Sequence, residues 1–105
     1  GLWAQLRLEE AGGGLQEPGG SAFLSCCTSG FSFRCYPVWW FRHAPRGSLE
    51  WVSFIDYLGH GQNNTAAVQD RATAFRDNSL SEASLSLQDL HPQDSAQYFC
   101  AIHTG

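Results

Sequence analysis

The sequence predicts an all-β domain, a sandwich of antiparallel sheets, and two observations support this fold class. Short stretches of alternating apolar and polar residues recur about every ten residues, separated by Gly, Pro, Asn, Asp and Ser. The apolar periodicity that is typical of helices is nearly absent. Within residues 85–88, Leu85 and Leu87 share one face of a strand while Ser86 and Gln88 share the other, as a half-buried strand requires.

Length, charge and cysteine usage limit the number of domains and the classes of partner. The 105 residues suffice for one domain with its own core. A net charge of -4 with only six Lys and Arg argues against nucleic-acid and anionic-membrane partners, because both attract clustered cations. Four cysteines without a CxxC repeat or Cys/His ligand spacing favour an oxidising compartment over a zinc site. We therefore expect a secreted, extracellular domain.

A spaced set of cysteine, tryptophan and tyrosine residues connects the chain to a known family. Cys26 and Cys100 lie seventy-four residues apart, Trp40 follows the first by fourteen, and Tyr98 precedes the second by two. This pattern resembles that of immunoglobulin variable domains. The resemblance implies a disulfide between Cys26 and Cys100 that joins the two sheets, with Trp40 packed against it. It also implies that the Tyr98 hydroxyl ties a corner back to the backbone.

The resemblance is closest to an antibody heavy-chain variable domain, over residue 5 to about residue 102. Residues 1–4 precede it and are expected to form an N-terminal extension to a variable domain at residues 5–105. They are too few and too uncharged for a signal peptide. The stretches that carry the resemblance are, in chain order, residues 10–15, 18–21, 24–26, 29–33, 40–45, 49–53, 76–79 and 94–101. Residues 91–94 are expected to form a turn.

The chain departs from the family at its C-terminal end. It stops at Gly105, before the last strand of the family (strand G) with its Trp-Gly-x-Gly signature. We therefore expect a V-type Greek-key sandwich that is truncated before strand G and lacks the third hypervariable loop. The strand that carries Tyr98 and Cys100 would then expose an unpaired row of backbone donors and acceptors.

A second departure lies in the expected core. Ala72, Ala74 and Ala83 stand where the family has larger side chains, and each such reduction costs roughly 2–5 kcal/mol of a total stability of roughly 5–15 kcal/mol. Phe75 is expected to refill part of this space. Phe23 stands where the family places a polar residue, so its ring is expected to face water unless the strand register slips.

The weakened sandwich leaves a second structural hypothesis open, a cross-β amyloid fibril of the same chain. Four uncharged, β-prone windows without proline support it, at residues 22–27, 38–41, 52–55 and 98–102. Healthy variable domains contain such windows too. The combination with a missing strand and small core residues makes self-association into fibrils the alternative to antigen binding.

The resemblance places antigen contacts on residues 32–37 and 56–64. Tyrosine offers broad amphipathic contact at low entropic cost, and polar neighbours supply adaptable hydrogen bonds. The alternative is that these are ordinary solvated loop residues. The candidates are Arg34, Tyr36, Asp56, Tyr57, His60 and Gln62.

The resemblance also implies a surface that grips an immunoglobulin light-chain variable domain. The apolar members of this surface would otherwise form an exposed patch. Phe41 is also what autonomous camelid domains carry, whereas Leu49 and Trp51 are of the pairing type, and we favour pairing. The candidates are Phe41, His43, Leu49, Trp51 and Phe99. Arg71 and Asp94 match a structural charge pair at the base of the sandwich.

Two modifications stay open at this stage. Cys27 cannot share the bridge of its neighbour, because adjacent strand residues face opposite ways, so Cys27 and Cys35 either pair locally or stay as thiols. Asn63-Asn64-Thr65 is an N-glycosylation triplet that is either used at Asn63 or unused.

The sequence gives no support for catalysis, a cofactor or a metal. The four histidines show no metal-ligand spacing. No serine lies in a Gly-x-Ser-x-Gly elbow. We therefore expect a non-enzymatic recognition domain.

Overall fold

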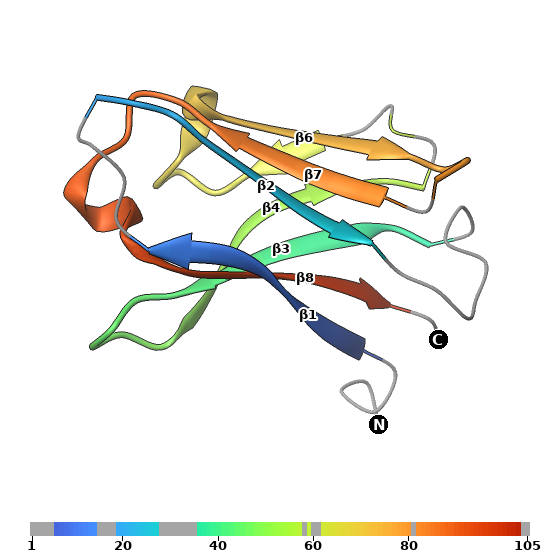
Figure 1. Ribbon diagram of the computed structural model, residues 1–105, viewed down its shortest axis with the longest axis horizontal. Helices are drawn as coiled ribbons and strands as arrows, with labels where there is room; N and C mark the ends of the chain where they lie inside the picture. Colours follow the sequence, from blue (N-terminus) through green and yellow to red (C-terminus); the bar gives the residue numbers. More distant parts are fainter. Residues whose placement is uncertain are drawn as a thin grey trace.

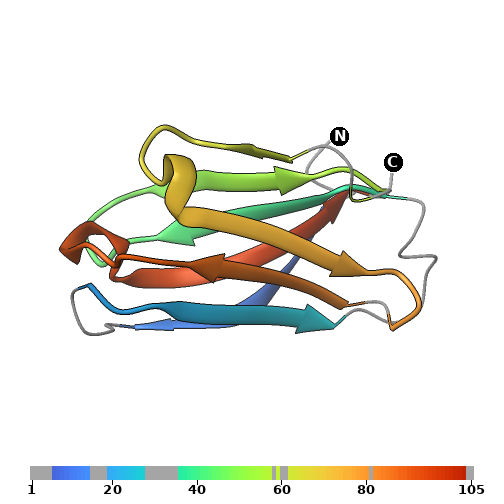
Figure 2. The same cartoon turned by 90° about the horizontal axis from the view of Figure 1, so that it is seen from above.

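The computed structural model describes residues 6–14, 19–27, 36–57, 59, 62–80 and 82–103, with the backbone alone for residues 6–14, 27, 102 and 103. Two antiparallel sheets face each other (Figures 1 and 2). Their strands are β1 (Leu6–Gly14), β2 (Ala22–Cys27), β3 (Val38–His43), β4 (Leu49–Ile55), β5 (Gln62–Asn64), β6 (Ala72–Asp77), β7 (Glu82–Leu87) and β8 (Ala96–His103). The predicted all-β sandwich is confirmed.

The two sheets differ in size. The larger has the strand order β1-β8-β3-β4-β5, and the smaller has the order β2-β7-β6. Two short 3-10 helices, η3 (Gln69–Arg71) and η4 (Pro92–Asp94), connect strands at one end. The turn predicted at residues 91–94 corresponds to η4.

Alternation along the strands sends one set of side chains into the space between the sheets. In β3, Val38 and Trp40 are fully buried, whereas Trp39 and Phe41, which alternate with them, are half-buried. Trp40 lies opposite Cys100 in the β3–β8 register. Cys26 and Cys100 form the predicted disulfide, with their Cα atoms 6.5 Å apart, and so join β2 of one sheet to β8 of the other.

The expectation of an unpaired edge on β8 is wrong. β1 runs antiparallel along this edge, from Leu6 opposite His103 to Gly14 opposite Ala96, with a register shift between Glu10 and Gly12. Figure 1 shows β1 beside β8. The exposed backbone groups of β8 need partners, and the N-terminal strand supplies them. As a consequence β1, and not β8, is an outer strand of the larger sheet.

The small core residues lie where the sequence predicts them. Ala72, Ala74 and Ala83 are 4%, 5% and 1% exposed. Phe75, however, is 49% exposed, so the expectation that it refills the core is wrong. It follows Ala74 on β6, and strand alternation therefore turns its ring to the outer face.

Phe23 and Leu24 show which side chains of β2 point into the core and which point into solvent. Phe23 is 68% exposed and Leu24 is 9% exposed, which confirms that the phenyl ring faces water. Leu24→Ala is expected to lower the free energy of unfolding by about 2–5 kcal/mol, whereas Phe23→Ser should change it by less than about 0.5 kcal/mol. Urea titrations followed by tryptophan fluorescence measure both. Equal losses in the two variants would contradict this register.

Candidate binding site

One outer face of the larger sheet is aromatic. Trp39 and Phe41 point outward from β3, and the register places Phe54 opposite Trp39 and Trp51 opposite Phe41. On the other side of β3, Phe99 of β8 also lies opposite Phe41. All five side chains are half-buried. They form one continuous surface across three strands, called here the aromatic face.

A bulge in β4 explains why two aromatic residues three positions apart share this face. The register pairs Trp40 with Ser53 and Phe41 with Trp51, so Val52 is an extra residue. Val52 and Ser53 are 1% and 0% exposed, and both point inward. Simple alternation from Trp51 would have turned Phe54 into the core, which is why the sequence did not identify it.

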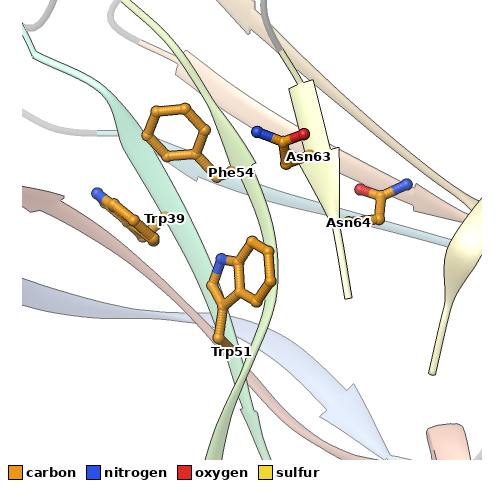
Figure 3. Close-up of a pocket in the computed structure, with 5 residues that line it drawn as sticks. All are labelled: Trp39, Trp51, Phe54, Asn63 and Asn64. Atoms are coloured by element: carbon orange, nitrogen blue, oxygen red, sulfur yellow. The ribbon is translucent and has the colours of Figure 1, made fainter. Parts of the chain in front are cut away.

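The aromatic face contains a cleft. The ring centroid of Trp39 lies 4.6 Å from that of Phe54 and 6.2 Å from that of Trp51, with interplanar angles of 58° and 59°. The Trp51 indole Nε1 donates a hydrogen bond to the Ser53 carbonyl at 3.1 Å. These three rings, with Asn63 and Asn64, line a cleft of about 440 Å³ (Figure 3).

The structure brings all five candidates for the light-chain surface onto the larger sheet. Phe41, Trp51 and Phe99 belong to the aromatic face itself. His43 and Leu49 lie opposite each other at the end of β3 and β4, and both are exposed. Trp39 and Phe54 are additional members. Trp39 could have been found from the sequence, because it alternates with the buried Trp40.

The described loop candidates meet at one end of the sandwich. Tyr36 packs against the core, and Tyr57 is 49% exposed. Gln62 donates hydrogen bonds to Asn64 Oδ1 at 3.1 Å and to the Ala72 carbonyl at 3.3 Å, so its amide is directed toward the other sheet. The remaining described candidate is Asp56, which is half-buried. Arg34 and His60 lie outside the described residues.

Arg76 of β6 holds two of these loop segments in place. Its Nη2 donates to the Tyr36 carbonyl at 2.8 Å, and its Nη1 donates to the Asp56 carbonyl at 2.6 Å. Burial lowers the pKa of Arg76, and the charge of Asp56 opposes this shift. Asn78 Nδ2 donates to the Tyr57 carbonyl at 3.0 Å. The smaller sheet therefore fixes the backbone from which the loop side chains project.

A charge cluster lies at the end with the 3-10 helices. The predicted pair is confirmed, because Arg71 Nη1 lies 2.6 Å from Asp94 Oδ2. Arg42, which the sequence did not reveal, donates from Nη1 to Asp94 Oδ1 at 2.9 Å and from Nε to Glu50 Oε1 at 2.6 Å. Tyr98 donates to the Asp94 carbonyl at 2.8 Å, which is the predicted corner.

The cluster keeps its charges despite burial. Burial would raise the pKa of Asp94, but hydrogen bonds from Arg71, the His91 backbone and Arg42 hold that pKa at about 2. Burial by itself would lower the pKa of Arg42. Hydrogen bonds with Glu50, Tyr98 and Asp94 outweigh this effect and raise the pKa above its usual value. Asp94 and Arg42 are therefore ionised at neutral pH, and the cluster has a structural role.

Other predicted features fall partly outside the described residues. Cys35 lies outside them, and for Cys27 the backbone alone is described, so their pairing stays a prediction. The N-terminal extension at residues 1–4 also lies outside them. Within the described ranges, no group of His, Cys, Asp and Glu side chains could hold a metal ion, and no helix is long and apolar enough to span a bilayer.

Comparison with known families agrees with this geometry. Residues 15–105 match the immunoglobulin V-set domain. Domains of this family generally recognise other proteins or ligands and are not catalysts. The match includes both bridged cysteines, Trp40, Tyr98 and every residue of the aromatic face. The chain therefore belongs to the immunoglobulin V-set family.

Proposed function

We propose that this V-set domain is a secreted antibody heavy-chain variable domain that pairs with a light-chain variable domain and binds antigen through its loops. The aromatic face carries the proposal. Five half-buried aromatic side chains on one sheet face exceed what an isolated soluble domain needs to expose. Aromatic residues are enriched and charged residues are depleted at the centre of protein interfaces.

The aromatic face also has the layout of an interface. Its centre holds Phe41, flanked by Trp51 and Phe99 on neighbouring strands. Exposed His43 and Leu49 lie at its border, where solvent contact is retained. Buried aromatic anchors surrounded by a more polar rim are typical of surfaces that bind another protein. A light-chain variable domain is the partner that the heavy-chain resemblance implies.

Antigen recognition is assigned to the loop end. Tyr57 is exposed there, and Tyr36 and Asp56 are half-buried beside it. Arg76 fixes the backbone beneath them, so less conformational entropy is lost when a ligand binds. Gln62, Arg34 and His60 remain candidates for contact.

Affinity for a light-chain variable domain tests the pairing. Trp51→Ala and Phe41→Ala are each expected to weaken binding by about tenfold or more, because each removes an aromatic anchor. Phe75→Ala is the matched control, since Phe75 is 49% exposed but lies on the other sheet. Titration calorimetry gives the affinities, and thermal unfolding checks that each variant is folded. Unchanged affinity in folded Trp51→Ala and Phe41→Ala would contradict the pairing.

Amyloid assembly of the same chain is the second candidate. Its support is the exposure of two phenyl rings on the outer face of the smaller sheet, Phe23 at 68% and Phe75 at 49%, together with the three buried alanines. Incubation of the purified domain near neutral pH tests it. Dye-positive filaments with a strand spacing of roughly 4.8 Å would favour it, whereas a lasting monomer with cooperative unfolding would exclude it.

A further inference from the structure

We propose that Asn63 carries an N-linked glycan whose first N-acetylhexosamine lies in the aromatic cleft against Trp51, Phe54 and Trp39. The glycan would thereby cover part of the aromatic face with the chain's own sugar. The placement of the sugar follows from the geometry around Asn63. Its consequence for light-chain pairing rests on the function proposed above.

The strand register selects Asn63 over its neighbour. Asn63 lies opposite Phe54 in the β4–β5 pair, and Phe54 lies opposite Trp39, so the three side chains form a row on the outer face. Asn64 also borders the cleft, but it lies opposite the buried Ser53 and its side-chain amide is directed toward the smaller sheet. Its Oδ1 accepts from Ser53 Oγ at 2.6 Å. Its Nδ2 donates to the Ala72 carbonyl at 2.9 Å.

Asn63 is also the residue that the glycosylation triplet makes the acceptor, because Thr65 stands two positions after it. Its side chain is exposed, and within the described part of the chain no hydrogen bond involves its amide. β5 is one of the two outer strands of the larger sheet. Figure 3 shows the Asn63 amide beside Phe54 at the border of the cleft.

The covalent step is the usual transfer to an asparagine amide. A bond forms between Asn63 Nδ2 and the anomeric carbon of a sugar supplied by a lipid-pyrophosphate-linked oligosaccharide. The bond between that carbon and the pyrophosphate oxygen breaks, and the lipid pyrophosphate leaves with the electron pair. One amide proton is lost to solvent. The secretory compartment that the disulfide requires is also the compartment in which secreted proteins receive such sugars.

The cleft suits a single sugar ring. Its volume of about 440 Å³ lies within the roughly 300–1,000 Å³ of small-molecule pockets. The Trp51 Nε1 donor is already used by the Ser53 carbonyl, so Trp51 offers its ring and not a polar edge. The C–H face of a hexosamine can pack on these rings and remove apolar area from water on both sides. A tether at Asn63 keeps the local sugar concentration high.

Three forms of the domain, produced in a glycosylating host, test the proposal. They are the natural sequence, Asn63→Gln, and Asn63→Gln combined with Phe23→Asn. The last variant moves the triplet to residues 23–25, because Ser25 already stands two positions after Phe23. Phe23 is 68% exposed on the smaller sheet, so the moved glycan lies away from the aromatic face. Intact mass before and after peptide N-glycosidase treatment reports occupancy.

Proton NMR of the natural sequence, trimmed to one sugar, should show Overhauser contacts between sugar protons and the Trp51 or Trp39 rings. These contacts should be lost when the glycan is moved. Affinity for a light-chain variable domain should be about tenfold weaker for the natural sequence than for Asn63→Gln, with no such weakening for the moved glycan. An unglycosylated natural chain, or a glycan without ring contacts, would overturn the proposal. If the Asn63→Gln domain does not bind the light chain, the proposed pairing is wrong. The Overhauser contacts still show, independently of pairing, whether the sugar lies in the cleft.

Discussion

Removal of the Cys26–Cys100 bridge is expected to lower the free energy of unfolding by about 4 kcal/mol, from the entropy of closing a long loop. The bridged residues are 74 positions apart and join the two sheets. A whole domain has roughly 5–15 kcal/mol of stability, and three buried alanines already reduce the packing of this core. The unbridged domain should therefore be partly or fully unfolded at 37 °C.

The measurement uses a background with Cys27→Ser and Cys35→Ser, so that reduction breaks only this bridge. Guanidinium titrations of the oxidised and reduced forms are compared by circular dichroism. Cys26→Ala with Cys100→Ala should match the reduced form. A difference below about 1 kcal/mol between oxidised and reduced forms would show that the bridge does not hold the sheets together.

Replacement of Asp94 by Ala should cost about 3–5 kcal/mol, because it removes the buried carboxylate that pairs with the buried Arg42 guanidinium. The side chains of Arg42 and Asp94 are 5% and 3% exposed, so water cannot replace the lost contact. Asp89→Asn is the matched control. Asp89 is 74% exposed in a 3.8 Å contact with His91, and its loss should change stability by less than about 0.5 kcal/mol. Urea titration at neutral pH compares the two variants, and equal effects would contradict the cluster's role.

The same carboxylate predicts acid sensitivity. The pKa of Asp94 is about 2 in the folded domain, below the ordinary 3.8. The unfolded chain therefore binds the proton first, so the stabilisation is complete above about pH 4 and is lost as the pH falls toward 2. The loss amounts to about 2 kcal/mol. Asp94→Asn should remove this part of the pH dependence, and an unchanged acid transition in that variant would assign it to other groups.

The sequence predicted the features that the family pattern carries. The resemblance to variable domains implies the Cys26–Cys100 bridge, the corner at Tyr98 and the outward ring of Phe23, and the structure confirms them. The inward positions of the alanines follow for the same reason. The family resemblance predicted which residues contact one another, and strand alternation predicted which side of the sheet each side chain faces.

Features that depend on long-range pairing were missed. The bulge at Val52 changes which residues of β4 face outward, and alternation alone hides Phe54. Arg42 belongs to a strand of aromatic residues, and only the fold brings it to Asp94, fifty-two positions later. Local sequence patterns also do not predict which sheet edge β1 joins, and the structure pairs it with β8. The expected unpaired edge on β8 is therefore absent.

Hydroxyl-radical footprinting of the Asn63→Gln domain, alone and with a light-chain variable domain, tests whether the aromatic face is the pairing surface. It reports the solvent access of individual aromatic side chains by mass spectrometry. If this face pairs with the light chain, the complex should show protection of its five rings, Trp39, Phe41, Trp51, Phe54 and Phe99. Phe23 and Phe75 on the smaller sheet should stay as reactive as in the free domain. Protection of Phe23 and Phe75 with an unchanged aromatic face would contradict pairing through this surface.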